Sequence, residues 1–125
     1  MDADYHRNAL ASDEHDFEQS LYVVATVMSA PVRERAVVDA GLKAFAFDSG
    51  LPQVWGARGL DYVKAADEHG VLTVAADREP LQPGDRVWLI PGHCDPTVNL
   101  YDWIVGVRGT RVECLWPVAA RGALG

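Results

Sequence analysis

Long apolar runs and positive charge are both scarce in this chain of 125 residues. No apolar run approaches the roughly 20 residues that a helix needs to cross a bilayer, so we expect no membrane-spanning helix. The formal net charge of −7 argues against a nucleic-acid partner, because nucleic-acid phosphates would repel the chain. Residues 1–7 are polar and lack the apolar core of a secretory signal. We therefore expect a cytoplasmic location.

Cysteine and lysine are also scarce. The two cysteines, Cys94 and Cys114, do not suffice for a disulfide framework, which agrees with a reducing, cytosolic setting. Lys43 and Lys64 are the only lysines, which restricts any chemistry that needs a lysine amine. The composition is otherwise ordinary for a soluble globular protein, with 49% hydrophobic and 23% charged residues. The length suits one domain with its own core.

Short segments rich in β-branched and aromatic residues alternate with turns along most of the chain. This pattern predicts strands over residues 21–29, 35–39, 62–66, 71–74, 86–91, 103–107 and 111–116. Residues 45–59 contain several glycines and a proline and predict a long loop, and loops of that length are often functional. Helical periodicity is almost absent, apart from an expected helical turn at 97–102 with Asp95 as its N-cap.

These features predict an all-β fold, mainly an antiparallel β-barrel or sandwich with one short helical turn. Residues 1–20 are polar and acidic and are expected to form a solvated arm. Residues 21–125 are expected to form the β-domain itself.

The segment with the most chemical character is residues 91–98, with the sequence PGHCDPTV. His93 and Asp95 are two residues apart, and in an extended segment alternate side chains point the same way. An imidazole and a carboxylate on one side suit a divalent cation of borderline to hard character. Two ligands fall short of the four that close a structural site, so a plain turn with an exposed Asp95 remains the alternative on these residues alone.

Three further residues are candidates near such a site. Glu68 and His69 lie at the predicted tip of a hairpin, where polar side chains are more often solvated than catalytic. Cys94 stands between the two candidate ligands. The same alternation would point it away from His93, and a nucleophilic cysteine needs a partner that lowers its pKa. We therefore interpret Cys94 as a packed thiol.

The motif belongs to a longer pattern that has a known counterpart. Residues 83–90 (PGDRVWLI) precede it and residues 99–102 (NLYD) follow it. Together with residues 37–44 (VVDAGLKA) and 67–70 (DEHG), this pattern closely resembles the C-terminal domain of D-threonine aldolases. Those enzymes belong with D-serine dehydratases and 3-hydroxy-D-aspartate aldolases among the pyridoxal-phosphate enzymes of the alanine racemase fold type. The resemblance is clearest over residues 21–117.

The resemblance implies a role for the two candidate ligands. His93 and Asp95 match the His-x-Asp pair that holds a divalent metal beside the cofactor in the aldolases. In the dehydratase branch the second ligand is typically cysteine, so Asp95 indicates the aldolase branch. A shell of histidine, aspartate and water does not discriminate sharply between metals, and we expect Mn²⁺ first, then Mg²⁺ or Zn²⁺.

The resemblance also implies an activity for a complete enzyme. It would be a lyase that cleaves a small D-3-hydroxy-amino acid to glycine and an aldehyde. In the family the lysine that binds pyridoxal phosphate belongs to an N-terminal α/β barrel, and neither Lys43 nor Lys64 lies in the corresponding motif. We therefore expect the isolated chain to be inactive, to need that barrel as its partner, and to self-associate. Two alternatives stay open: a non-catalytic stand-alone or truncated binding module, and part of a D-serine dehydratase-like enzyme.

Overall fold

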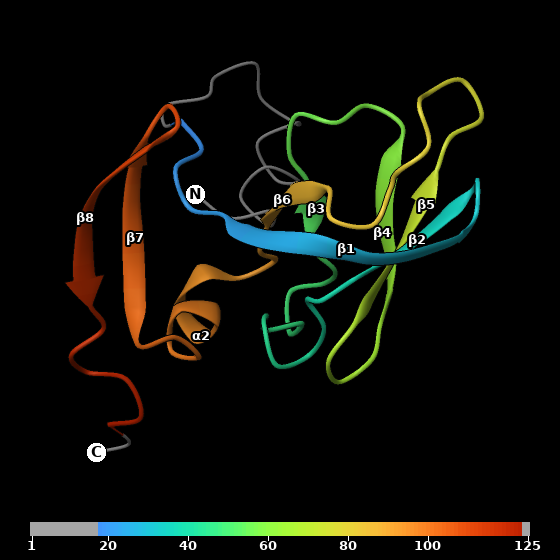
Figure 1. The fold of residues 1–125 in the computed structure, drawn as a ribbon. Helices are drawn as coiled ribbons and strands as arrows, with labels where there is room; N and C mark the ends of the chain where they lie inside the picture. Colours follow the sequence, from blue (N-terminus) through green and yellow to red (C-terminus); the bar gives the residue numbers. More distant parts are fainter. Residues whose placement is uncertain (1–17, 124–125) are drawn as a thin grey trace.

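The computed structural model describes residues 18–123, so the predicted acidic arm at 1–20 lies almost wholly outside the described residues. Figure 1 shows a β-rich fold with one short helix. The strands are β1 (Val23–Val32), β2 (Arg35–Val38), β3 (Gln53–Val54), β4 (Leu60–Ala65), β5 (Gly70–Val74), β6 (Arg86–Ile90), β7 (Trp103–Arg108) and β8 (Arg111–Pro117). The helix α2 (Cys94–Val98) lies between β6 and β7.

Six strands form one antiparallel sheet in the order β3-β6-β1-β2-β5-β4. The two edge strands, β3 and β4, lie beside each other, so the sheet curls into a nearly closed barrel. The expected all-β fold is thereby confirmed, and of the two expected architectures the barrel is the correct one. The long strand β1 pairs with β6 from Val23 to Thr26 and with β2 from Val27 to Val32. Register shifts on the β2 side bend it around the barrel.

Alternation of side chains along the strands builds the core. Inward positions are buried and the positions between them are at least partly exposed, as a period of two requires. The inward set comprises Ala25, Val27, Ala36, Val38, Leu60, Tyr62, Leu72, Val74, Val87 and Leu89. Phe45, which follows β2 in the chain, adds a fully buried ring from outside the strands.

The turn after β2 is fixed by a close approach of two backbones. A Cβ atom at Gly41 would collide with the carbonyl oxygen of Ala66, so only glycine fits there. The backbone N–H of Leu42 donates to that same carbonyl at 2.9 Å, and Lys43 donates to Asp67 at 3.0 Å. These bonds hold the turn on the β4–β5 hairpin and set the direction of the chain that follows it.

Two features of the observed fold were not predicted from the sequence. The predicted loop at 45–59 contains the short strand β3, which pairs with β6. The predicted hairpin of β7 and β8 is confirmed, but it stands to one side of the barrel in Figure 1 and, within residues 18–123, pairs as its own two-stranded sheet. In the same part of the chain, no helix has both the length and the apolar character required to span a membrane.

Candidate metal centre

The motif that follows β6 starts a helix, which corrects two expectations. His93 is the N-cap of α2 with an extended backbone (φ −144°, ψ 123°), and the helix begins at Cys94. The predicted extended run from His93 to Asp95 is therefore wrong, and so is the prediction of Asp95 as N-cap. Pro96 explains the change, since proline fits the first helical turn, where backbone N–H groups have no partner within the helix. Asp95 lies in that turn, where a carboxylate is favoured by the helix dipole.

The helical start at Cys94 removes one argument for His93 and Asp95 as a ligand pair. It does not decide whether the two side chains bind one metal ion. Strand alternation no longer explains why His93 and Asp95 would face one ion, because only His93 is extended. Binding of one cation by both side chains stays a prediction. Among residues 18–123, no three His, Cys, Asp or Glu side chains lie close enough together to hold a metal ion alone.

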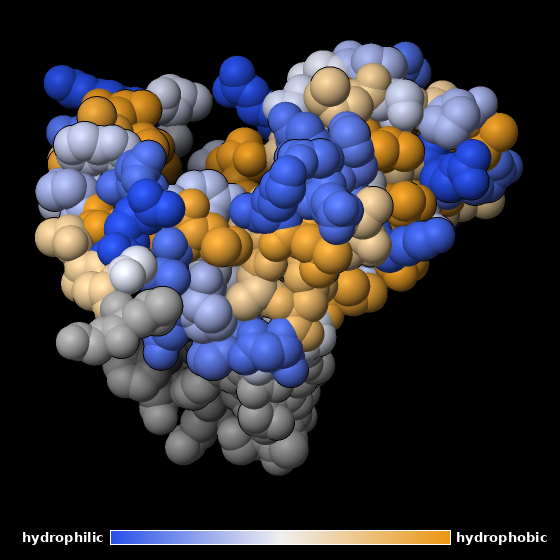
Figure 2. Space-filling model, turned by 90° about the horizontal axis from the view of Figure 1, so that it is seen from below, coloured by the Kyte–Doolittle hydropathy of each residue, from blue (hydrophilic) through white to orange (hydrophobic). Residues whose placement is uncertain are grey.

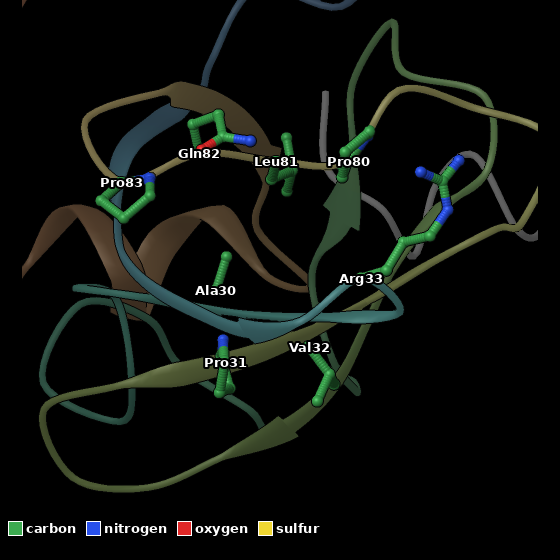
Figure 3. Close-up of a pocket in the computed structure, with 8 residues that line it drawn as sticks. All are labelled: Ala30, Pro31, Val32, Arg33, Pro80, Leu81, Gln82 and Pro83. Carbon is green, nitrogen blue, oxygen red and sulfur yellow. The ribbon is translucent and has the colours of Figure 1, made fainter.

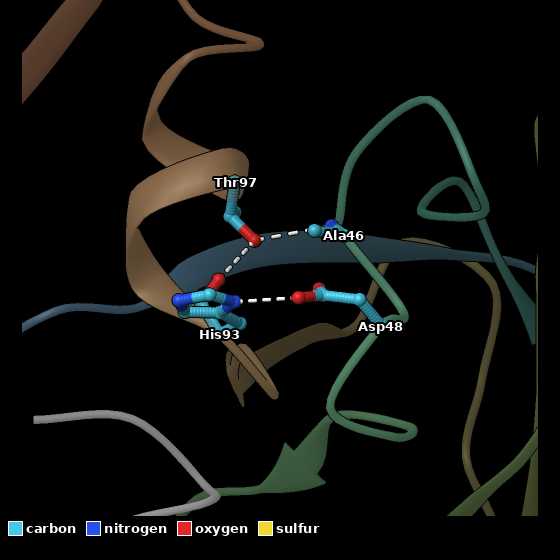
Figure 4. Close-up of polar contacts among 4 residues, drawn as sticks. All are labelled: Ala46, Asp48, His93 and Thr97. Carbon is cyan, nitrogen blue, oxygen red and sulfur yellow. Dashed lines mark hydrogen bonds and ion pairs between the residues drawn. The ribbon is translucent and has the colours of Figure 1, made fainter.

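The structure adds a residue that the sequence did not reveal. The Nδ1 atom of His93 lies 2.6 Å from Oδ2 of Asp48, as Figure 4 shows. A carboxylate only accepts hydrogen bonds, so Nδ1 carries the proton and donates it. The hydrogen bond from His93 is the main reason that the pKa of Asp48 lies below its ordinary value. In the neutral imidazole, the ring nitrogen Nε2, on the side away from Asp48, then carries the lone pair that a metal would bind.

Asp48 reaches His93 through a close approach of the two chain segments. A Cβ atom at Gly92 would collide with the carbonyl oxygen of Gly50. Only glycine therefore lets the segment after Asp48 lie against the backbone just before His93. The N–H of Gly50 donates to the carbonyl of Phe47 at 3.1 Å, which closes a turn around Asp48.

A series of three hydrogen bonds joins this segment to the helix. Alternate residues 44, 46 and 48 bond to residues 101, 97 and 93, which are four apart. In these bonds Tyr101 Oη donates to the Ala44 carbonyl at 2.9 Å and Ala46 N–H donates to Thr97 Oγ1 at 3.1 Å.

Thr97 holds the first turn of the helix as well. Its hydroxyl donates to the carbonyl oxygen of His93 at 2.7 Å while it accepts the bond from Ala46, and Figure 4 shows both contacts. Thr97 is 2% exposed and is the buried polar residue of the described core. His93 is thereby held at its backbone by Thr97 and at its ring by Asp48.

The other side of segment 44–48 faces the barrel core. Phe45 and Phe47 lie between the residues that bond to the helix, and each ring packs near the ring of Tyr62, with centroids 6.2 and 6.3 Å apart. The Tyr62 hydroxyl donates to the carbonyl of Ala40 at 2.7 Å. Segment 44–48 therefore lies between the barrel core and helix α2.

The remaining candidates have other surroundings. Glu68 and His69 are exposed at the tip between β4 and β5, as expected. Glu68 forms an ion pair with Lys43, which ties the tip to the turn at Gly41 and raises the pKa of Lys43. Cys94 is half-buried, and neither it nor Cys114 forms a disulfide.

A separate pocket of about 330 Å³ lies between residues 30–33 and residues 80–83, as Figure 3 shows. Six of its eight lining residues are apolar, and its charged side chain is Arg33. That guanidinium already donates to the backbone carbonyls of Ala76 at 3.2 Å and Arg78 at 3.0 Å. None of the predicted site residues lines this pocket, and we assign no site to it.

The described residues form an antiparallel β-barrel domain in which a histidine caps a short helix. Comparison with known proteins identifies the family of this domain. Residues 20–107 match the family model described as "Putative serine dehydratase domain". Because the match covers more than half of the chain, the chain belongs to this family.

Three relatives set its context. A 3-hydroxy-D-aspartate aldolase of Paracoccus denitrificans is 49% identical over 127 residues, which is 98% of this chain and 32% of that protein. The crystal structure of D-threonine aldolase from Filomicrobium marinum superposes with a TM-score of 0.91 at 42% identity, covering 100% of this chain and 34% of that one. An uncharacterized protein of Mycobacterium tuberculosis is 35% identical over 112 residues, 82% of this chain and 84% of that protein. The chain thus spans about a third of the length of the aldolases that it matches.

Proposed function

We propose that this chain is the metal-binding C-terminal domain of an aldolase that cleaves D-3-hydroxy-amino acids to glycine and an aldehyde. The observation that carries the proposal is the similarity of the whole chain to a third of two such enzymes, at 49% and 42% identity. The His-x-Asp motif at 93–95 supports the aldolase branch over the dehydratase branch, in which cysteine would stand at position 95.

In this proposal Nε2 of His93 and the carboxylate of Asp95 bind the divalent metal, with Mn²⁺ preferred over Mg²⁺ and Zn²⁺. The donor chemistry fits, since a neutral imidazole and a carboxylate both bind such ions. The bond from Nδ1 to Asp48 leaves Nε2 as the nitrogen with the lone pair. Two protein ligands leave coordination positions for water and substrate, as a catalytic site requires. When bound, the metal supplies polarisation of the substrate β-hydroxyl.

Pyridoxal phosphate does not fit the lysines of this chain. Lys43 forms an exposed ion pair with Glu68, and Lys64 is exposed on β4. A cofactor that needs a lysine amine and a desolvated pocket must therefore bind elsewhere, in the part of the enzyme that this chain does not contain. We expect the purified chain, mixed with pyridoxal phosphate and desalted, to retain no stoichiometric cofactor and to release no glycine from D-threonine.

The exposed apolar face of the β7–β8 hairpin supports the proposal that this chain works with a further domain. Trp103, Val105 and Leu115 on one of its faces are 51–58% exposed. An isolated two-stranded hairpin is marginally stable in water, so such a face needs a cover. Figure 2 shows further apolar residues at the surface between charged ones. We propose that the N-terminal domain of the complete enzyme covers the hairpin.

A chimera tests the proposal. This chain replaces the equivalent third of the D-threonine aldolase from Filomicrobium marinum, and glycine release from D-threonine is measured with added Mn²⁺. We expect metal-dependent activity that His93→Ala abolishes. A folded chimera that binds pyridoxal phosphate but shows no metal-dependent cleavage of D-threonine or 3-hydroxy-D-aspartate would contradict the proposal.

A second candidate is a stand-alone, non-catalytic binding domain. It is favoured by the mycobacterial relative, which has about the same length as this chain. The two candidates differ in one measurable property. A stand-alone domain is expected to be monomeric at high concentration, whereas a domain that lacks its partner is expected to self-associate through the β7–β8 hairpin.

A further inference from the structure

We infer that Asp48 is a positioning residue for the metal site, which holds the ring of His93 in the tautomer and direction that present Nε2 to a divalent cation. The inference rests on the proposed function, because it requires His93 to be a ligand. Asp48 acts through His93 and is not itself assigned to the metal.

The chemistry of the contact supports this role. The separation of 2.6 Å between Nδ1 and Oδ2 is that of a charge-assisted hydrogen bond. Histidines that bind metals almost always donate their second ring N–H to a carboxylate, a backbone carbonyl or water, which fixes the tautomer and makes the ligand more basic. His93 and Asp48 form such a pair although they lie 45 residues apart in the chain.

Asp48 is itself held in place. Two residues before it, Ala46 is bonded to the buried hydroxyl of Thr97. Two residues after it, Gly50 lies against Gly92, at a contact that no larger residue allows. The backbone that carries Asp48 is therefore anchored on both sides by contacts with the segment that carries His93. A carboxylate on a backbone held in this way restricts the directions that the imidazole can adopt.

A role in stability alone is the competing explanation, and the exposure of the pair argues against it. The side chains of His93 and Asp48 are 38% and 55% exposed. Ion pairs as exposed as this contribute little to folding, because water screens them and two side chains must be ordered. Loss of Asp48 is therefore expected to change the His93 ring and its metal affinity while leaving thermal unfolding nearly unchanged.

The test uses the 125-residue chain labelled with ¹⁵N. The ring signals of His93 are identified by their loss in His93→Gln, and its tautomer is read from the two ring-nitrogen shifts. Wild type is compared with Asp48→Ala, with Asp48→Asn, which keeps an acceptor, and with Asp102→Asn. Asp102 is the matched control, because it is an exposed carboxylate in one ion pair, with Arg121. Affinity for Mn²⁺ is measured from paramagnetic broadening of the same signals.

We expect wild type, Asp48→Asn and Asp102→Asn to show Nδ1 protonated, and Asp48→Ala to show a mixture of tautomers. We expect Asp48→Ala to bind Mn²⁺ about 10- to 100-fold more weakly than wild type, with Asp48→Asn between them and Asp102→Asn unchanged. An unchanged tautomer and affinity in Asp48→Ala would overturn the inference while the metal site stands. If neither this chain nor the chimeric enzyme that contains it binds Mn²⁺ more tightly than its own His93→Gln variant, the proposed function fails, and the inference fails with it.

Discussion

The buried hydroxyl of Thr97 accepts a hydrogen bond from the backbone N–H of Ala46, at 3.1 Å. It also donates to the carbonyl of His93, so one side chain joins the loop after β2 to the start of α2. Asp48 lies two residues after Ala46 in the loop, and His93 lies four residues before Thr97. The side chains of Asp48 and His93 form a hydrogen bond with each other. The geometry of the candidate metal centre therefore depends on a residue that binds no metal.

Replacement of Thr97 by valine is expected to destabilise the domain by about 1–3 kcal/mol, because the Ala46 N–H and the His93 carbonyl lose a buried partner. Thr97→Ser keeps the hydroxyl and is expected to cost less, about 1 kcal/mol for the lost methyl group. Denaturant unfolding of both variants measures the difference. Thr73→Val on the exposed side of β5 is the control. Equal stability of Thr97→Val and wild type would contradict this account of the loop.

Stability at high pH is expected to depend on Tyr62. Burial raises the pKa of Tyr62 to about 12, above its ordinary value of 10.0. The folded state therefore holds the phenolic proton more tightly than the unfolded state. The stability linked to this proton is fully present below about pH 10 and is lost as the pH rises through about 12. Tyr62→Phe lacks this dependence.

Unfolding midpoints of wild type and Tyr62→Phe, measured over this pH range, check the linkage. The phenylalanine variant is expected to be less stable at neutral pH, because it loses the bond to the Ala40 carbonyl. The two stability curves are expected to converge as the pH rises. A constant difference between them at all pH values would show that Tyr62 does not titrate as its burial requires.

The exposed face of the β7–β8 hairpin is expected to make the isolated chain self-associate. Val105 and Leu115 are directly paired across the two strands, and both are more than half exposed. Replacement of both by lysine is expected to reduce association and to increase solubility, because it interrupts the apolar face. Thr110→Lys, in the turn of the same hairpin, adds charge without touching that face. Light scattering at high concentration that found wild type strictly monomeric would contradict this prediction.

The fold was largely predictable because its signals are local. The β-branched residues of segment 21–29 predict a strand within a few residues. The inner face of β1 is not readable in the same way, because the exposed Val24 and Met28 are as apolar as the buried Ala25 and Val27. The two-residue strand β3 escaped prediction, because only its pairing with Ile90 and Leu89 makes it a strand. The start of α2 was also missed, because glycine and proline around His93 and Asp95 are equally compatible with a turn.

The candidate site was only partly predictable for a related reason. His93 and Asp95 stand out through their spacing, which is readable along the chain. Asp48 lies 45 residues from His93, and no spacing rule connects them. Their contact depends on the curvature of the barrel and on the glycine at position 92, which lets the two backbones approach. The available signal was the length of the predicted loop at 45–59, which indicates function without naming a residue.

Substitution at position 95 is expected to change metal preference. Asp95→Cys would replace a hard carboxylate by a soft thiolate and is expected to shift selectivity from Mn²⁺ toward Zn²⁺. Competition between the two ions in the chimeric enzyme measures the shift. Asp95→Asn is the control, because it removes the charge while keeping an oxygen donor. Unchanged selectivity in Asp95→Cys would indicate that residue 95 does not touch the ion.

Metal titration of the chimeric enzyme tests the central claim most directly, because the isolated domain supplies only part of a coordination shell and is expected to bind weakly. Binding of Mn²⁺ is measured for wild type, His93→Ala, Asp95→Ala and Cys94→Ser. We predict that His93→Ala and Asp95→Ala each abolish binding and metal-dependent cleavage, while Cys94→Ser leaves both nearly unchanged. Loss of the metal in Cys94→Ser with its retention in Asp95→Ala would contradict the ligand assignment, and the assignment to the aldolase branch with it.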